Sequence, residues 1–295
     1  MKSTRLFLAV AVPVMLAVAL TSYRKDKVGE AGKITITTTF TGELNEFYLA
    51  GSGQATIDWG DGKIDDVMLK PLPDNSWDMF EDEGWMFPHH YYPPPDEADL
   101  WEEEYIPDEI PDTITITITG DVTALVISSP AEPDGSQYYG VTRIDVSKMP
   151  MLRFLDCSAE KLTSLDVSKN IELVNLFCQG NELSELNLTS NTALEYLNCS
   201  INNLSTLDIS QNTALEGVEC IGSNLTSLTI ANTLSALEYL ICYDNKFDAA
   251  ALDDIFSALP DRTGMERGML EINIRGCNEC ENKAGNKNWL LNAGM

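Results

Sequence analysis

Five of the seven cysteines recur at a regular spacing, and they are the first residues whose chemistry has to be considered. Cys157, Cys178, Cys199 and Cys220 lie 21 residues apart, and Cys242 follows after 22 residues. A row of thiols could carry redox chemistry or hold a metal ion. Each cysteine, however, occupies an apolar position of the pattern L-x-x-L-x-C-x-x-N-x-L-x-x-L-x-[VIL], where a thiol is a buried and unreactive small hydrophobic group. Side chains stacked in register point the same way, which disfavours disulfides between neighbouring copies, so we expect these cysteines to pack rather than react.

The remaining cysteines, Cys277 and Cys280, form a C-x-x-C pair in a polar segment outside this period. In an exported protein such a pair closes a small disulfide or remains as two free thiols, and the sequence leaves both open. A zinc site would need two further ligands, which the sequence does not offer.

Little else in the chain is suited to catalysis. The only histidines, His89 and His90, are adjacent, and no H-E-x-x-H, G-x-S-x-G or Cys–His arrangement occurs. We therefore expect no enzyme activity, no metal and no cofactor. A glycan-active hydrolase that uses two carboxylates in a cleft is a minor alternative, because the chain is acidic but no such pair stands out.

The net charge argues against two classes of partner. The chain has 295 residues, with 46 acidic against 19 basic side chains and a formal net charge of −27. Nucleic acid binding needs clustered Lys and Arg on one face, and an anionic membrane surface also attracts basic segments. The hydrophobic fraction of 44% is ordinary for a globular protein, so we expect a packed core.

Residues 1–22 have the pattern of a secretory signal peptide. A short basic region precedes an uncharged apolar run from Leu6 to Leu20, which is short for a membrane-spanning helix. The following residues resemble a bacterial lipoprotein box, but Tyr23 stands where the lipid-bearing Cys would be, so lipidation there is excluded. We expect export, with a secreted, periplasmic or cell-surface location and no membrane span in the mature chain. An uncleaved membrane tether is the alternative.

Residues 33–120 predict a small β domain, joined to the leader by a linker over 23–32. Apolar and polar residues alternate with period two in its strand-like runs, and a W-G-D-G turn at 59–62 follows one of them. Residues 71–112 interrupt this domain with fourteen acidic residues, eight prolines and eight aromatics, and without Lys or Arg. Three interpretations remain open for this insertion: a proline-stiffened excursion packed on the β domain, a partner-binding loop, or a calcium site that no ligand spacing supports.

The cysteine pattern runs through the second half and predicts a repeat fold over residues 121–247. Residues 173–188 and 194–209 are full copies, and a degenerate first copy begins at Val122. One copy cannot bury its own apolar side, so the leucines of successive copies must stack into a continuous core. The L-x-C triplets should form parallel strands about 4.8 Å apart, and the Asn three residues after each Cys should bond the backbone at the turn. A cap over 248–295 follows, in which Asp248 begins a helix.

These copies are leucine-rich repeats, and the chain from about residue 33 resembles a family of secreted bacterial surface proteins. In that family a PKD-type domain with a W-G-D-G turn runs straight into cysteine-bearing leucine-rich repeats. The resemblance implies a mainly β fold: an N-terminal PKD-like β-sandwich, a leucine-rich-repeat solenoid of 21–22-residue rungs, and a C-terminal helical cap. It also implies adhesion or binding outside the cell, without catalysis. This chain departs from the family at Tyr23 and in the insertion.

The strand face beside the L-x-C triplets is the candidate binding surface. We expect a monomeric, non-enzymatic module that binds a protein or carbohydrate ligand there, because tyrosine supplies contact area at a low entropy cost. An ordinary strand face, and a structural scaffold or spacer at the cell envelope, are the competing interpretations. The predicted ligand-binding residues are Phe177, Gln179, Tyr196, Asn198, Ser200, Glu219, Ile221, Tyr239, Ile241 and Tyr243.

Overall fold

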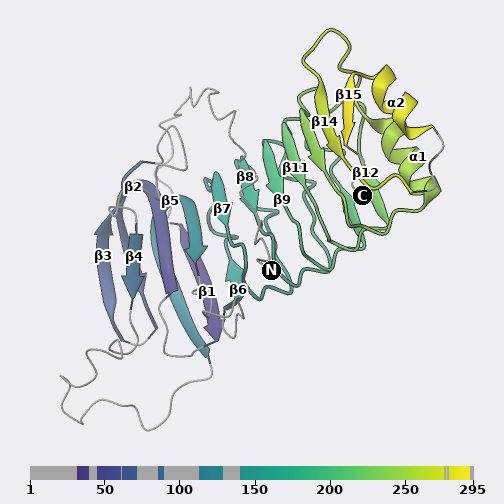
Figure 1. Cartoon of the computed structure of the whole chain (residues 1–295). Helices are drawn as coiled ribbons and strands as arrows, with labels where there is room; N and C mark the ends of the chain where they lie inside the picture. The colour runs from purple at the N-terminus through teal and green to yellow at the C-terminus, as the bar shows by residue number, and fades with distance from the viewer. Residues whose placement is uncertain are drawn as a thin grey trace, which may run out of the picture.

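The structure is a computed structural model that describes residues 32–39, 45–60, 62–71, 86–89, 113–128, 140–275, 277 and 279–292. It is mainly β, and its strands run side by side from β3 at one end to β15 at the other (Figure 1). The strands of the first half are β1 (Lys33–Thr39), β2 (Asn45–Asp58), β3 (Ile64–Met68), β4 (Met86–His89), β5 (Thr113–Ser128) and β6 (Val141–Asp145). Those of the second half are β7 (Phe154–Asp156), β8 (Asn175–Phe177), β9 (Tyr196–Asn198), β10 (Thr206–Asp208), β11 (Gly217–Glu219), β12 (Ser227–Thr229), β13 (Tyr239–Ile241), β14 (Gly268–Glu271) and β15 (Trp289–Asn292). The helices are α1 (Ala249–Ala258) and α2 (Cys280–Asn286).

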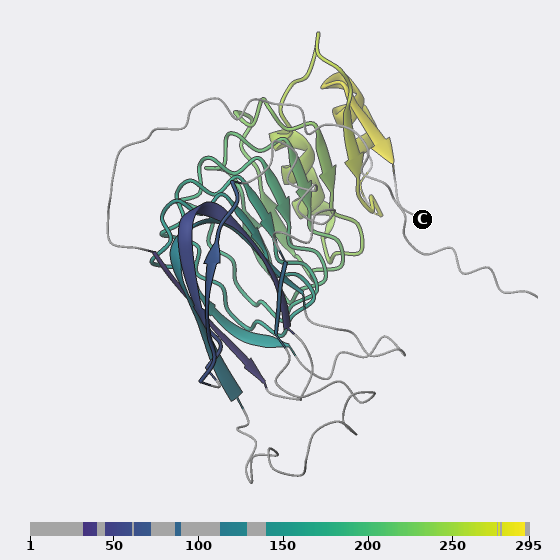
Figure 2. The same ribbon diagram turned by 90° about the vertical axis from the view of Figure 1, so that its left-hand side faces the viewer.

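The period-two alternation of the first half produces strands with one buried face. Ile34 and Ile36 of β1 are fully buried and pair antiparallel with Ile118 and Ile116 of β5. The described strands of this half form one hydrogen-bonded sheet in the order β3-β2-β5-β1-β6, in which β4 also pairs with β2, so the predicted PKD-like β-sandwich is not confirmed. In Figure 2 these strands lie at the front, and the repeats of the second half extend behind them.

The W-G-D-G segment lies between β2 and β3. The Trp59 side chain is 1% exposed, and its indole N–H donates to Asp65 Oδ2 at 2.7 Å. Gly60 has a φ of +81°, and a Cβ there would lie 2.4 Å from the carbonyl oxygen of Thr115, so this position requires glycine.

Strand β5 joins the two halves of the molecule. Its first part pairs antiparallel with β1, its second part pairs parallel with β7, and β2 pairs antiparallel with residues of both parts. The predicted boundary at residue 120 therefore falls inside this strand. The result is one 13-stranded sheet that runs from the first half into the repeats.

Each repeat contributes one short strand and one layer of the core. Leu155, Leu176, Leu197, Val218 and Leu240 are aligned by the parallel pairing of β7, β8, β9, β11 and β13, and all lie inside one hydrophobic cluster. The five repeat cysteines are buried and unbonded, as their apolar position predicts. On the opposite side of the coil, β10 and β12 form a separate two-stranded parallel sheet.

The asparagines that follow the cysteines bond the backbone of two neighbouring rungs, as predicted. Asn202 Nδ2 donates to the carbonyl oxygens of Cys178 and Cys199, and its Oδ1 accepts from Leu183 N–H. Where Asn is replaced, the substitute still bonds the backbone: Glu160 Oε2 accepts from Val141 N–H at 2.6 Å, and Ser223 Oγ donates to the carbonyl of Cys199.

The C-terminal segment both covers the core and extends the sheet. Asp248 caps α1 by accepting from Ala251 N–H, and α1 buries Leu252, Ile255 and Phe256. Beyond residue 247, β14 and β15 continue the parallel sheet after β13.

Several expectations concern residues outside this description. The predicted signal peptide and residues 23–31 of the linker lie outside the described residues, as does most of the insertion over 71–112. Of that insertion, residues 86–89 form β4, which pairs antiparallel with β2. His89 belongs to β4, whereas His90 is outside the described residues. In the part of the chain that the structure describes, no helix is long and apolar enough to span a membrane.

Candidate binding face

The sheet of the repeats has one face against the leucine core and one face directed away from it, which we call the open face. It is formed by the side chains on either side of each buried strand residue of β7, β8, β9, β11 and β13. In β9, for example, Leu197 is 2% exposed, whereas Tyr196 and Asn198 are partly exposed. This alternation follows from the pleat, which directs successive side chains to opposite faces.

The structure brings the predicted residues together on this face. Phe177, Asn198, Glu219 and Ile241 occupy one register position across β8, β9, β11 and β13. Tyr196 and Tyr239 occupy the other position, separated by Gly217. The remaining predicted residues follow these strands at the same edge: Gln179, Ser200, Ile221 and Tyr243.

Two of the predicted residues present little surface. Ser200 is 5% exposed, and its Oγ accepts a hydrogen bond from Ile221 N–H at 3.0 Å. Ile241 is 9% exposed. Both therefore offer little surface to a ligand on this face.

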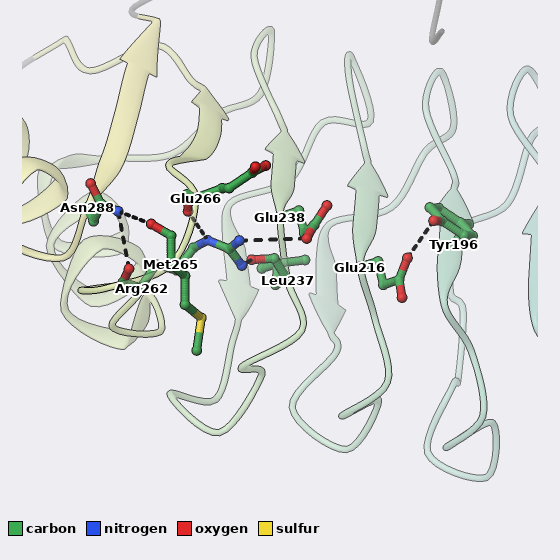
Figure 3. Close-up of polar contacts among 8 residues, drawn as sticks. All are labelled: Tyr196, Glu216, Leu237, Glu238, Arg262, Met265, Glu266 and Asn288. Carbon is green, nitrogen blue, oxygen red and sulfur yellow. Dashed lines mark hydrogen bonds and ion pairs between the residues drawn. The ribbon is translucent and has the colours of Figure 1, made fainter. Parts of the chain in front are cut away.

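Side chains of neighbouring rungs are hydrogen-bonded across the open face. The Tyr196 hydroxyl donates to Glu216 Oε2 at 2.5 Å (Figure 3). At the other end of β9, Asn198 Nδ2 donates to Glu219 Oε2 at 3.0 Å. Hydrogen bonds within the protein therefore fix the orientation of both glutamate side chains.

Gly217 makes room for a tyrosine ring. A Cβ at this position would lie 2.0 Å from Tyr239 Cζ and 2.2 Å from its hydroxyl oxygen. The ring of Tyr239 therefore lies over the backbone of β11, at the strand position between Glu216 and Glu219. Burial raises the pKa of the Tyr239 hydroxyl, and the charges of Glu219 and Glu216 raise it further, so the ring and the two carboxylates lie close together on the open face.

Sequence reasoning missed the residues that enter each strand. Glu195, Glu216 and Glu238 occupy the same position of the period and form what we call the glutamate row. The signal was present, because each is the last residue of an A-L-E triplet in its own copy. Gly217 was missed because a glycine in a strand gives no sign of which neighbouring side chain will lie across it.

Arg262 lies at one end of the glutamate row (Figure 3). Its guanidinium is paired with Glu238 Oε1 at 3.7 Å and donates to the carbonyl oxygen of Leu237 at 2.6 Å. Its Cζ lies 6.0 Å from the centroid of the Trp289 ring, and the side chain is 4% exposed. Arg262 thereby links the C-terminal segment to the last repeat.

The electrostatic environment of the face is unfavourable for its own carboxylates. Burial raises the pKa of Glu219, and the charge of Glu271 raises it further. Burial also raises the pKa of Glu195, an effect that Glu216 increases and Arg153 opposes. The face thus carries negative charge that is partly removed from water and incompletely balanced.

Toward the first half of the chain, the same face becomes apolar. Ala50, Ala124, Val126 and Phe154 form a small buried cluster against which Tyr48 and Phe177 pack. The ring centroids of Phe154 and Phe177 are 5.6 Å apart.

The cysteines do not add a reactive centre to this face. The ladder thiols lie on the core side, and burial raises the pKa of Cys157, Cys178 and Cys199 well above the usual value. Cys277 and Cys280 form a disulfide in the C-terminal segment. Within the described ranges, no group of three or more His, Cys, Asp or Glu side chains is arranged to hold a metal ion.

No protein-family model matches the chain, and no curated protein matches it. Similar solved structures include the functional domain of InlJ from Listeria monocytogenes, named as containing a cysteine ladder, at 28% identity over 44% of this chain and 32% of that chain, with a TM-score of 0.30. A leucine-rich-repeat protein of Leptospira interrogans is 24% identical over 39% of this chain and 31% of that chain, with a TM-score of 0.36. The internalin InlF of L. monocytogenes is 17% identical over 59% of this chain and 64% of that chain, with a TM-score of 0.28.

The chain thus spans less than two thirds of each of these proteins. Its own geometry defines the fold: parallel rungs, a stacked leucine core and a cysteine ladder make the second half a leucine-rich-repeat solenoid.

Proposed function

We propose that this protein is a non-enzymatic recognition module that binds a protein or carbohydrate ligand through the open face of its repeats. The observation that carries this proposal is the tyrosine and carboxylate arrangement on β9, β11 and β13, in which Tyr239 lies over Gly217 and Glu216 and Glu219 are held by neighbouring side chains. Preoriented groups lose little conformational entropy on binding.

The proposal includes an exported location at the cell surface or in the periplasm, and a PKD-like first domain that displays the repeats. The leader-like pattern of residues 1–22 and the W-G-D-G turn support these two points. The family resemblance supports adhesion as the general role.

The test is a capture experiment on the chain from about residue 24, immobilised and offered glycans and host or bacterial surface extracts. Replacing Tyr196, Tyr239 and Tyr243 with Ala should abolish capture of a ligand that the parent holds, because these rings supply most of the aromatic contact area. A matched control replaces Thr206, Ser227 and Thr229, which are exposed on β10 and β12, with Ala. The control should capture the ligand normally. The tyrosine variant loses the bond from Tyr196 to Glu216 and the ring over Gly217, so it should melt at a lower temperature but keep the circular dichroism spectrum of the parent at the assay temperature.

The second candidate function is a scaffold that holds other parts of the envelope apart. The continuous sheet from the first half into the repeats favours it, because such a sheet resists bending. If the tyrosine variant captures every ligand as well as the parent does, the open face is not the binding surface. The absence of any captured ligand would favour the scaffold.

A further inference from the structure

We propose that the open face recognises a cationic side chain, an arginine of an extended protein segment, at the position formed by Glu216, Tyr239 and Glu219. This inference rests on the proposed function, since it names the chemistry of the partner at the same face. It concerns a single position of the face, where the ring of Tyr239 lies over Gly217 of β11.

The first argument is the chemistry that the three side chains offer together. A guanidinium binds carboxylates with two parallel N–H donors and stacks on aromatic faces, so a tyrosine ring between two glutamates matches both of its preferences. The Tyr239 ring lies over Gly217, close enough to Glu219 and Glu216 for both charges to act on its hydroxyl. A carbohydrate would use the ring face but would leave the two carboxylates without a balancing charge.

The second argument comes from the chain itself, which already places a guanidinium one rung away. Arg262 combines a carboxylate, Glu238, with a backbone carbonyl and the face of Trp289. Glu238 and Glu216 occupy the same position of successive copies (Figure 3). Within the molecule, the carboxylate of Glu238 is paired with the Arg262 guanidinium. The carboxylate of Glu216, one copy away, offers the same chemistry to a guanidinium of a partner.

The third argument is the charge balance of the partly buried part of the face. Among the described residues, no ion pair involves Glu216 or Glu219. Both are only partly exposed, and Glu219 also lies near Glu271. A cation that arrives with a partner would relieve this repulsion, whereas an anionic or neutral partner would not.

The experiment must separate this position from the general attraction of a chain with a net charge of −27 for any cation. The probe is a short blocked Arg-Ser repeat peptide, measured by calorimetry at about 0.15 M salt, where distant charges are screened. Its citrulline counterpart has the same shape without the charge and serves as the ligand control. We expect the arginine peptide to bind at least about tenfold more tightly than the citrulline peptide.

Two variants of the protein locate the binding. Glu216→Gln with Glu219→Gln keeps an oxygen at each position that can accept from Tyr196 and Asn198. This variant should bind the arginine peptide with an affinity at least about tenfold lower. The matched control, Glu182→Gln with Glu185→Gln, removes the same charge from exposed positions that follow β8 and lie outside the open face. It should change the affinity for the peptide by less than about twofold. Gly217→Ala changes no charge but displaces the Tyr239 ring, and should also lower the affinity for the arginine peptide.

Equal losses in the two glutamate variants, or equal affinities for the two peptides, would overturn the inference, because binding would then follow net charge or shape alone. The outcome is also distinguishable from failure of the proposed function. If the captured ligand is lost by the tyrosine variant but kept by Glu216→Gln with Glu219→Gln, the face binds its ligand without a cation and only this inference fails. If both variants keep the ligand, both proposals fail.

Discussion

At the scale of single residues, buried amides hold the rungs in register. The sequence predicted one set of asparagines that bonds the backbone, the residues that follow the cysteines. The structure contains a second set on the descending side, in which Asn191 Nδ2 donates to the carbonyls of Val167 and Asn170, and Asn170 and Asn212 make equivalent bonds. These asparagines recur with the same period, but their position in polar turns gave no sign that they are fully buried.

Replacing Asn191 with Ala should lower the free energy of unfolding by about 1–3 kcal/mol, because two buried carbonyl oxygens each lose one of their two donors. Chemical unfolding in urea, followed by circular dichroism, measures this change. Asn203→Ala is the control: the residue is exposed, and its loss should change stability by no more than about 0.5 kcal/mol. Equal effects of the two substitutions would show that the buried amide does not hold the rungs.

At the scale of elements, the C-terminal segment is stabilised by contacts that the sequence only outlined. The sequence predicted helix α1, its capping residue Asp248 and its apolar side. It gave no sign that Lys287 closes the other end: its Nζ donates to the carbonyl oxygens of Ser257 and Leu259 at 2.6 and 2.8 Å. A cation at a helix C-terminus satisfies carbonyls that have no partner within the helix.

The disulfide between Cys277 and Cys280 fixes the start of α2, and its reduction should destabilise this segment. The closed loop is short, so the loss should be about 2 kcal/mol by the chain-entropy estimate. Thermal unfolding with and without a thiol-free reductant measures it, since the buried ladder cysteines do not form disulfides. The stability of the Cys277→Ala variant should not respond to the reductant. A response of the variant equal to that of the parent would place the effect elsewhere.

At the scale of the whole molecule, the shared strand β5 makes the two halves interdependent. The core cluster runs without interruption from Ile34 of the first half to Trp289 of the last strand. Near the junction, Gly51 of β2 lies so close to the backbone of β5 that a Cβ would be 2.1 Å from the carbonyl oxygen of Asp121. Backbone cannot move aside as a flexible side chain can, so this contact couples β2 to the strand that begins the repeats.

Gly51→Ala should therefore destabilise the entire chain rather than its first half alone. We expect a loss of at least about 2 kcal/mol in the free energy of unfolding, with one transition in urea. Gly285→Ala provides the control, because its Cβ would meet nothing within 4 Å in helix α2 and should be neutral or slightly stabilising. Separate transitions for the two halves of the Gly51→Ala variant would contradict the coupling.

The sequence by itself determined the repeat fold. Its period and its apolar positions predicted the leucine core, the inert cysteine ladder and the face on which Tyr196, Tyr239 and Glu219 lie, because a side chain's place along a strand decides which face it occupies. The tertiary structure alone decided how those side chains meet. The bond from Tyr196 to Glu216, the tyrosine ring above Gly217 and the pairing of Arg262 with Glu238 join residues at least 20 positions apart. Such contacts depend on the register and close approach of separate rungs, which no local pattern encodes.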